Sequence, residues 1–239
     1  MKHTHKIFIK LIVFSILIFN FSACNSNSSE NDSKKLKEGE IVYEIKYPTY
    51  KRKNSILFKV LPKKMITSFK NNCYKNDFIF STNSLSLTII SDCNKKQTTL
   101  SYCDGARKKY TKIDTSNISV LLSQLPKYNR TSNDLESTTF MTFPSNKFKL
   151  TCIENQNTFD VISSEYIQIN DANWCTPFQG INDVLLSYQM TQFGIDMEFN
   201  AVEINQKDIN SNDLIIDSSY VLESMDKYLD EIKLFFSLF

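Results

Sequence analysis

Short runs of β-branched and aromatic residues, separated by turn residues, make up most of this chain. Leu85–Ile89 (LSLTI) alternates apolar and polar residues with a period of two, which is typical of a strand with one buried face. Asn71-Asn72 and Asp104-Gly105 separate such runs and are typical turn sequences. Since consecutive strands joined by tight turns pair antiparallel, the pattern predicts an antiparallel meander.

We predict about ten strands and two helices, which together make an α+β domain. The strands are expected around residues 41–47, 65–70, 74–81, 85–89, 97–103, 107–113, 138–143, 148–154, 158–163, 184–192 and 195–204. Residues 56–60 fit either a short helix or a strand. One helix is expected over Ser116–Gln124, before Pro126, and another over Ser219–Phe239, where apolar residues recur at helical spacing.

The first 24 residues have the composition of a secretory signal. Lys2, Lys6 and Lys10 precede and border an apolar run, Leu11–Phe19, and small residues lead into Cys24. A cysteine in this position resembles the lipobox of bacterial lipoproteins, in which the thiol receives a diacylglyceryl group before cleavage. The resemblance implies a signal peptide over 1–23, lipidation of Cys24, and attachment to a membrane of the cell envelope, most simply the outer membrane of a Gram-negative bacterium.

Three other interpretations of this segment stay open, namely a retained transmembrane anchor, a cytosolic core segment and plain secretion. The uninterrupted apolar run is much shorter than the ~20 residues that span a bilayer, which disfavours the anchor. Residues 24–38 contain the cysteine and a polar segment without large apolar groups, so we expect a flexible tether there. Fourteen such residues span ~20 Å r.m.s.. A single folded domain is then expected over 39–239.

Charge does not favour nucleic-acid binding. The chain has 28 basic and 26 acidic residues, and without the three lysines of the signal the mature part carries 25 against 26, a net charge near −1. Opposite charges are interspersed along the sequence, whereas a nucleic-acid binder normally has a basic excess on one face.

Residue types that common enzyme sites require are missing. Both histidines, His3 and His5, lie in the signal, which removes His-dependent acid/base chemistry and most zinc sites from the mature chain. The four glycines have no phosphate-binding spacing. Asp160, Glu165 and Asp171 are close in sequence and could in principle form a carboxylate pair, but solvated turns explain them more simply. We therefore predict no catalytic residues, no metal site and no cofactor.

Five cysteines follow Cys24, and an odd number leaves at least one thiol free or paired between molecules. They are Cys73, Cys93, Cys103, Cys152 and Cys175. None forms a CxxC motif, which argues against a redox site. We interpret Cys152 and Cys175 as small buried hydrophobic residues, and the pairing of the rest stays open.

A set of short segments lies between Glu38 and Tyr220 and includes Glu38–Ile45, Pro62–Met65, Ile90–Asp92, Asn173-Trp174 and Phe193–Ile195. Together these segments resemble a family of uncharacterised bacterial lipoproteins related in fold to the lipoprotein carriers LolA and LolB. The resemblance implies a strongly curved antiparallel sheet, an open half-barrel, whose concave side is closed by helices. In those carriers the concave side is apolar and holds acyl chains.

Two functions follow as hypotheses. The first is a membrane-anchored protein that binds a lipid, an acyl chain or another apolar ligand on the concave side, although the same aromatic residues could simply fill the core. The second is a structural lipoprotein that docks another envelope protein through exposed loops, with Trp174 as the anchor. The candidate ligand-binding residues are Tyr43, Ile45, Phe69, Phe78, Phe80, Ile89 and Leu100.

Overall fold

The computed structural model of the chain describes residues 35–50, 56–131, 135–192 and 194–237. The signal, Cys24 and most of the expected tether lie outside this part of the chain, as do the last two residues. Residues from Leu36 onwards form one compact unit. Leu36 is only 7% exposed, and its amide donates to the Tyr166 carbonyl at 2.8 Å. The folded unit therefore begins three residues before the predicted start at Gly39.

Strands dominate the described part of the chain. The strands are β1 (Glu38–Lys46), β2 (Lys64–Lys70), β3 (Cys73–Ile79), β4 (Leu85–Asp92), β5 (Gln97–Asp104), β6 (Lys108–Ile113), β7 (Tyr128–Arg130), β8 (Glu136–Phe140), β9 (Phe143–Cys152), β10 (Thr158–Ser164), β11 (Val184–Gln192), β12 (Ile195–Asn205) and β13 (Val221–Leu222). The helices are α2 (Ile56–Val60), α3 (Ile118–Leu122), α4 (Met225–Phe236) and a 3₁₀ turn, η3 (Ser211–Leu214).

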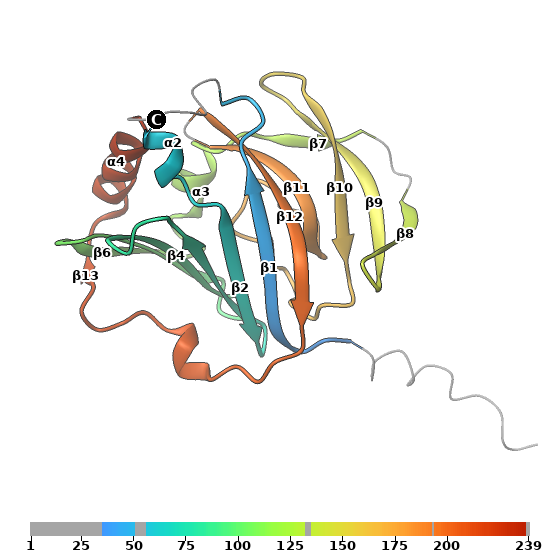
Figure 1. Cartoon of the computed structure of the whole chain (residues 1–239), viewed down its shortest axis with the longest axis horizontal. Helices are drawn as coiled ribbons and strands as arrows, with labels where there is room; N and C mark the ends of the chain where they lie inside the picture. The colour runs from blue at the N-terminus through green and yellow to red at the C-terminus, as the bar shows by residue number, and fades with distance from the viewer. Residues whose placement is uncertain (1–34, 51–55, 132–134, 193, 238–239) are drawn as a thin grey trace, which may run out of the picture. The chain divides into compact units, whose positions relative to one another are not determined.

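All these strands belong to one sheet, and the sheet is not closed. Its order is β13-β6-β5-β4-β3-β2-β1-β12-β11-β10-β9-β7, with β8 paired to β9. Neighbours in this order are mostly consecutive in sequence, as a meander requires, and the exceptions are the pairs β1–β12, β13–β6 and β9–β7. Strand direction rotates steadily across the sheet, from β9 and β10 to β4 and β6 (Figure 1). The α+β class predicted from sequence is confirmed.

The pairing of β1 with β12, which we call the seam, joins two meanders into one sheet. Glu40 pairs with Asn205 and Lys46 with Glu198, so the two strands are aligned along most of their length. The register shifts between Val42 and Tyr43, where β12 contributes one extra residue. Such a bulge increases the local twist of the pair, which fits the change of strand direction near the seam.

One face of the sheet is apolar and the other is polar. Residues at alternate positions of β1, β2 and β12 are buried, in the pattern expected for a sheet with one covered face. The opposite face carries partly exposed charged pairs, such as Lys75 and Asp77, whose Nζ and Oδ2 atoms lie 2.9 Å apart. We call the covered side the inner face, and its central residues are Tyr43, Met65, Phe78, Ile89, Leu100 and Phe199.

Helix α4 covers the inner face near β4–β6. Its buried residues Tyr228, Leu229 and Ile232, with the partly buried Met225 and Phe236, recur every three or four positions and form one apolar stripe. Figure 1 shows α2, α3 and α4 grouped near strands β2–β6. The fold thus places a helical cover over an apolar sheet face.

Three details of the prediction were wrong, for identifiable reasons. The expected strand at 138–143 is interrupted by a turn at Met141, whose φ is +56°, so β8 and β9 form a tight hairpin there. The expected helix over Ser219–Phe239 begins only at Met225, because Val221–Leu222 instead pair parallel with Lys109–Tyr110. That parallel pair makes the sheet mixed, whereas a purely antiparallel sheet was predicted.

The strands β7 and β13 were not predicted at all, since three and two residues are too short to show a period in sequence. In the part of the chain that the structure describes, none of the helices has the length and apolar character to cross a bilayer.

Substitution of Gly39 tests how closely the two strands of the seam are packed. A Cβ at this position would lie 2.3 Å from the carbonyl oxygen of Asn205, so Gly39→Ala must push the backbones of β1 and β12 apart. We expect the free energy of unfolding to fall by about 2 kcal/mol, measured by urea denaturation. Glu44→Ala, an exposed change on the same strand, should stay within about 0.5 kcal/mol of wild type. Equal effects of the two changes would contradict a tightly packed seam.

Candidate functional site

A cavity of about 200 Å³ lies between the inner face of the sheet and its cover. Strands β1–β5, β11 and β12 form its floor, and α3, α4 and the loop before β11 form its roof. An apolar cavity of ~150 Å³ is already sufficient to bind a benzene-sized molecule. This cavity can therefore admit a ligand of at least that size.

Alternation along each strand explains why the cavity is apolar. Side chains two residues apart point to the same face, so Met65 and Thr67 on β2 enter the cavity while their neighbours face away. The same spacing brings Phe78 of β3 and Ile89 of β4 to the floor. Aromatic contacts order this floor: Tyr188 stacks on Phe199 with ring centroids 4.8 Å apart.

Three tyrosines in the wall have hydroxyl groups that already donate hydrogen bonds to backbone carbonyls, so these hydroxyls are not available to a ligand. The hydroxyl of Tyr43 donates to the Leu185 carbonyl (2.7 Å), and that of Tyr74 donates to the Ala172 carbonyl (3.1 Å). The hydroxyl of Tyr47 donates to a backbone carbonyl in the same way. Burial raises the pKa of all three phenols, so they stay neutral. They add ring surface to the cavity, and their polar ends are already satisfied.

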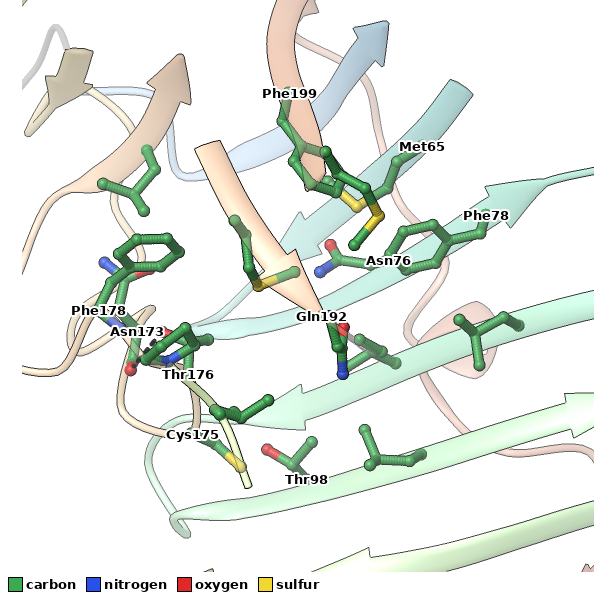
Figure 2. A pocket seen from close by; sticks show the side chains of 18 of the residues that line it. Met65, Asn76, Phe78, Thr98, Asn173, Cys175, Thr176, Phe178, Gln192 and Phe199 are labelled. Atoms are coloured by element: carbon green, nitrogen blue, oxygen red, sulfur yellow. Dashed lines mark hydrogen bonds between the residues drawn. The ribbon is translucent and has the colours of Figure 1, made fainter. Parts of the chain in front are cut away.

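A few polar groups remain among the apolar side chains. Thr67 Oγ1 donates to Asn76 Oδ1 at 2.8 Å, which leaves the amide nitrogen of Asn76 as a donor on the cavity side. Figure 2 shows Asn76, Gln192 and Thr98 around the same space as Met65 and Phe199. Mostly apolar pockets with a few oriented polar groups are typical of small-molecule sites.

Tyr228 of α4 is the one buried side chain of the described residues whose polar atom lacks a hydrogen-bond partner. It lines the cavity from the roof and is only 2% exposed. Its ring contacts that of Tyr102, with centroids 5.5 Å apart. Because an unsatisfied buried hydroxyl costs free energy, this oxygen is a donor that a bound molecule could use.

A group of charged residues, which we call the roof clamp, ties α4 to the sheet. Lys109 of β6 pairs with Glu223 and with Glu231, whose Oε1 lies 3.3 Å from Lys109 Nζ. The Tyr102 hydroxyl also donates to Glu231, and Lys227 donates to Glu223 at 2.7 Å. The roof is therefore attached by polar contacts at its edge and by apolar contacts over the cavity.

The clamp lowers the pKa of both carboxyl groups. Hydrogen bonds from Lys109 and then Lys227 hold the pKa of Glu223 below its usual range. For Glu231 the Tyr102 hydroxyl is the main cause of the lowered pKa, with Lys109 adding to it. Burial and the same contact raise the pKa of Tyr102 to about 12. Both carboxylates are therefore charged in the folded protein at neutral pH.

The structure distributes the seven residues proposed from sequence over three places. Tyr43, Phe78, Ile89 and Leu100 line the cavity. Ile45 and Phe69 are buried in the core beside it, with 2% and 0% exposure, and do not line it. Phe80 lies at a second cavity near the end of α4. Cavity residues on β11, β12 and α4 were missed because they come from the distant half of the sequence.

Trp174 does not have the exposure that its proposed role requires. Its side chain is 8% exposed, and the indole Nε1 donates to Ser91 Oγ of β4 at 2.9 Å. The expectation of an exposed loop tryptophan was therefore wrong. Its neighbours Ala172, Asn173 and Cys175 line the cavity, so the loop serves as part of the roof.

The five cysteines of the described residues are all free thiols. Cys152 and Cys175 are buried, as the sequence predicted. Burial raises the pKa of Cys175, which lines the cavity, to about 11, and that of Cys93 to about 12. Both therefore remain protonated at neutral pH.

Asp160, Glu165 and Asp171 do not form a common site. Asp160 of β10 pairs with Lys149 of β9 (2.7 Å), whereas Asp171 pairs with Lys96 (2.6 Å) at the turn after β4. Within residues 35–50, 56–131, 135–192 and 194–237, no group of three or more His, Cys, Asp or Glu side chains is placed to hold a metal ion.

Comparison with known proteins adds no family. No protein-family model matches the chain, and no curated protein matches it.

The roof clamp predicts how stability depends on pH. Because Glu223 and Glu231 have lowered pKa values in the folded state, their stabilising contribution is complete above the unfolded-state pKa of ~4.3 and is lost as pH falls below it. Lys109→Met removes the cation and should reduce this loss. Thermal melting between pH 7 and pH 3 should show a shallower decline for the variant than for wild type.

Lys112, an exposed residue of the same strand, provides the matched control. Lys112→Met should follow the wild-type decline. Parallel curves for wild type and Lys109→Met would contradict the clamp.

Proposed function

We propose that this chain is a lipid-anchored protein of the cell envelope that binds a lipid, an acyl chain or another apolar ligand. In this proposal the sheet is a curved, LolA-like half-barrel, and its inner face is the ligand-binding side. The cavity between this face and α4 is the single observation that carries the proposal.

Energetics support an apolar ligand over a polar one. Floor and roof are formed by rings and aliphatic groups, and the wall tyrosines have satisfied hydroxyls. Burying each CH₂ of a ligand in such a place contributes ~0.8 kcal/mol. A charged ligand group would lose its hydration there without gaining a charged partner.

Placement at a membrane rests on the sequence before Cys24, which lies outside the described residues. Two or more acyl chains on that cysteine would hold the protein stably, since a single chain binds only reversibly. A lipid-binding cavity and a lipid anchor on one chain fit the same environment. We propose the outer membrane of a Gram-negative bacterium as its location, and no catalytic role.

Docking of an envelope partner through Trp174 is the weaker alternative. That side chain is buried and hydrogen-bonded to Ser91, so it could contact a partner only after the roof loop opened. Loss of a partner in a Trp174 variant could then reflect unfolding of the loop.

Filling the cavity tests the binding function. Leu100→Trp places a larger side chain on the cavity floor, and we expect it to weaken binding of a fluorescent fatty acid at least tenfold, measured by titration. Ile153→Trp is the control, since Ile153 is 43% exposed beyond the end of β9 and should leave binding unchanged. If neither the wild type nor the control binds the probe, or if Leu100→Trp binds it normally, the cavity is not the binding site.

Membrane attachment is tested separately by Cys24→Ala. Because the variant cannot receive a thioether-linked lipid, we expect it to move from the membrane pellet to the soluble fraction after cell lysis. Cys73→Ala, a change of the same kind inside the folded unit, should remain in the pellet. A Cys24→Ala protein that still sediments with membranes would refute the lipid anchor.

A further inference from the structure

A second cavity, of about 210 Å³, lies beside the first under the C-terminal end of α4. Its wall is formed by Phe80 after β3, by the facing ends of β4 and β5, and by the last turns of α4. Phe80 and Phe235 meet edge to face across it, with ring centroids 6.5 Å apart. Leu234 at its border is 69% exposed, so this cavity reaches the protein surface.

The two cavities share a wall. Leu87 of β4 and Ile232 and Phe236 of α4 line both of them. These shared lining residues come from one sheet strand and from the last turns of α4. Side-chain rotation there could join them without any change in the sheet.

The shared floor is one continuous track along β4 and β5. Four cross-strand pairs follow one another on the inner face, Leu85–Asp104, Leu87–Tyr102, Ile89–Leu100 and Ser91–Thr98. The first two lie at the second cavity, whereas Leu87, Ile89, Leu100 and Thr98 line the first. On β5, Asp104 and Tyr102 line the second cavity and Leu100 and Thr98 line the first. From Asp104 to Thr98 the track is therefore ~20 Å long at ~3.3 Å per residue.

We propose that both cavities form one site for a single-chain amphiphile, with its tail along this track and its head outside the second cavity. The proposal rests on the proposed function and names its ligand class. An extended alkyl chain advances by ~1.25 Å per carbon, given a C–C bond of ~1.5 Å in a tetrahedral zigzag. The track therefore matches a chain of about 16 carbons.

The rim of the second cavity selects the head. Asp104 accepts from Arg107 Nε at 2.8 Å, and Arg107 is 59% exposed. Glu231 is the other charged residue of the rim, and it is paired with Lys109. Positive and negative groups therefore balance around the opening. A head with no net charge that carries both signs, such as phosphocholine, can pair with Arg107 and with Asp104, whereas a simple anion or cation meets a like charge.

Trp174 provides a reporter for the direction of the tail. It is the only tryptophan of the chain, and its indole contacts Ser91 at the end of the track opposite to Leu85. Bromine quenches indole fluorescence at short range, so a brominated chain reveals which of its carbons comes nearest to Trp174.

The test uses the full chain and palmitoyl lysophosphatidylcholine brominated either near the methyl end or near the carbonyl. We expect the methyl-end bromine to quench Trp174 fluorescence at least twice as strongly. With unbrominated alkylphosphocholines, affinity should rise about fourfold per carbon up to about 16 carbons and then level off. Stronger quenching by the carbonyl-end bromine, or a plateau reached by eight carbons, would overturn the proposal.

Two substitutions separate the second cavity from the first. Leu85→Phe narrows only the second cavity and should weaken binding of hexadecylphosphocholine at least tenfold, while Ile153→Phe, on the exposed β9–β10 connection, should not. Wild-type affinity of Leu85→Phe would show that the tail does not pass this cavity. The wild-type quenching pattern remains decisive if Leu85→Phe fails to fold.

Head selection is tested with three ligands that share a 16-carbon tail. Hexadecylphosphocholine should bind about tenfold more tightly than hexadecanoate or hexadecyltrimethylammonium, and Arg107→Gln, but not Lys112→Gln, should remove its advantage over the cation. Equal binding of all three would overturn the assigned head. If no alkyl-chain ligand binds the protein or quenches Trp174 fluorescence, the proposed function itself fails. If such ligands bind, but with another optimal chain length or the opposite orientation, only this inference is overturned.

Discussion

The pairing of β1 with β12 is the interaction on which the rest of the structure depends. Without it, the chain would form two separate meanders, each with an unprotected edge and an uncovered apolar face. With it, Tyr43 on one side and Phe199 and Tyr188 on the other enter the same space. The bulge opposite Val42 and Tyr43 adds twist at this point, so the seam also sets how the two halves are oriented.

Local features of the fold could be predicted from sequence, and long-range features could not. Alternation identified β4, because Leu85–Ile89 shows its buried face within a few residues, and turn residues between apolar runs identified its neighbours in the meander. No local pattern shows that Glu40 will pair with Asn205, or that Val221–Leu222 will add to β6. The same limit applies to the cavity. Tyr43, Phe78, Ile89 and Leu100 were found from strand faces, whereas Tyr228 and Tyr188 come from the distant end of the chain.

Trp174 shows why a loop residue is difficult to interpret from sequence. A large aromatic residue between Asn173 and Thr176-Pro177 has the local context of an exposed turn. Its burial depends on Ser91, which is 83 positions away and accepts its hydrogen bond. The loop is consequently part of the roof of the cavity, and its aromatic residue stabilises that roof.

Because synthesis proceeds from the N-terminus, the two strands of the seam become available at different times. Strand β1 is available early, but its partner β12 is complete only at Asn205, and the cover α4 follows after Met225. Such contacts between distant parts of a sequence form slowly. While the chain is being synthesised, the aromatic inner face of the first meander therefore stays uncovered until β12 and α4 have been made. A nascent chain with such exposed apolar surface is a natural client for chaperones that shield it.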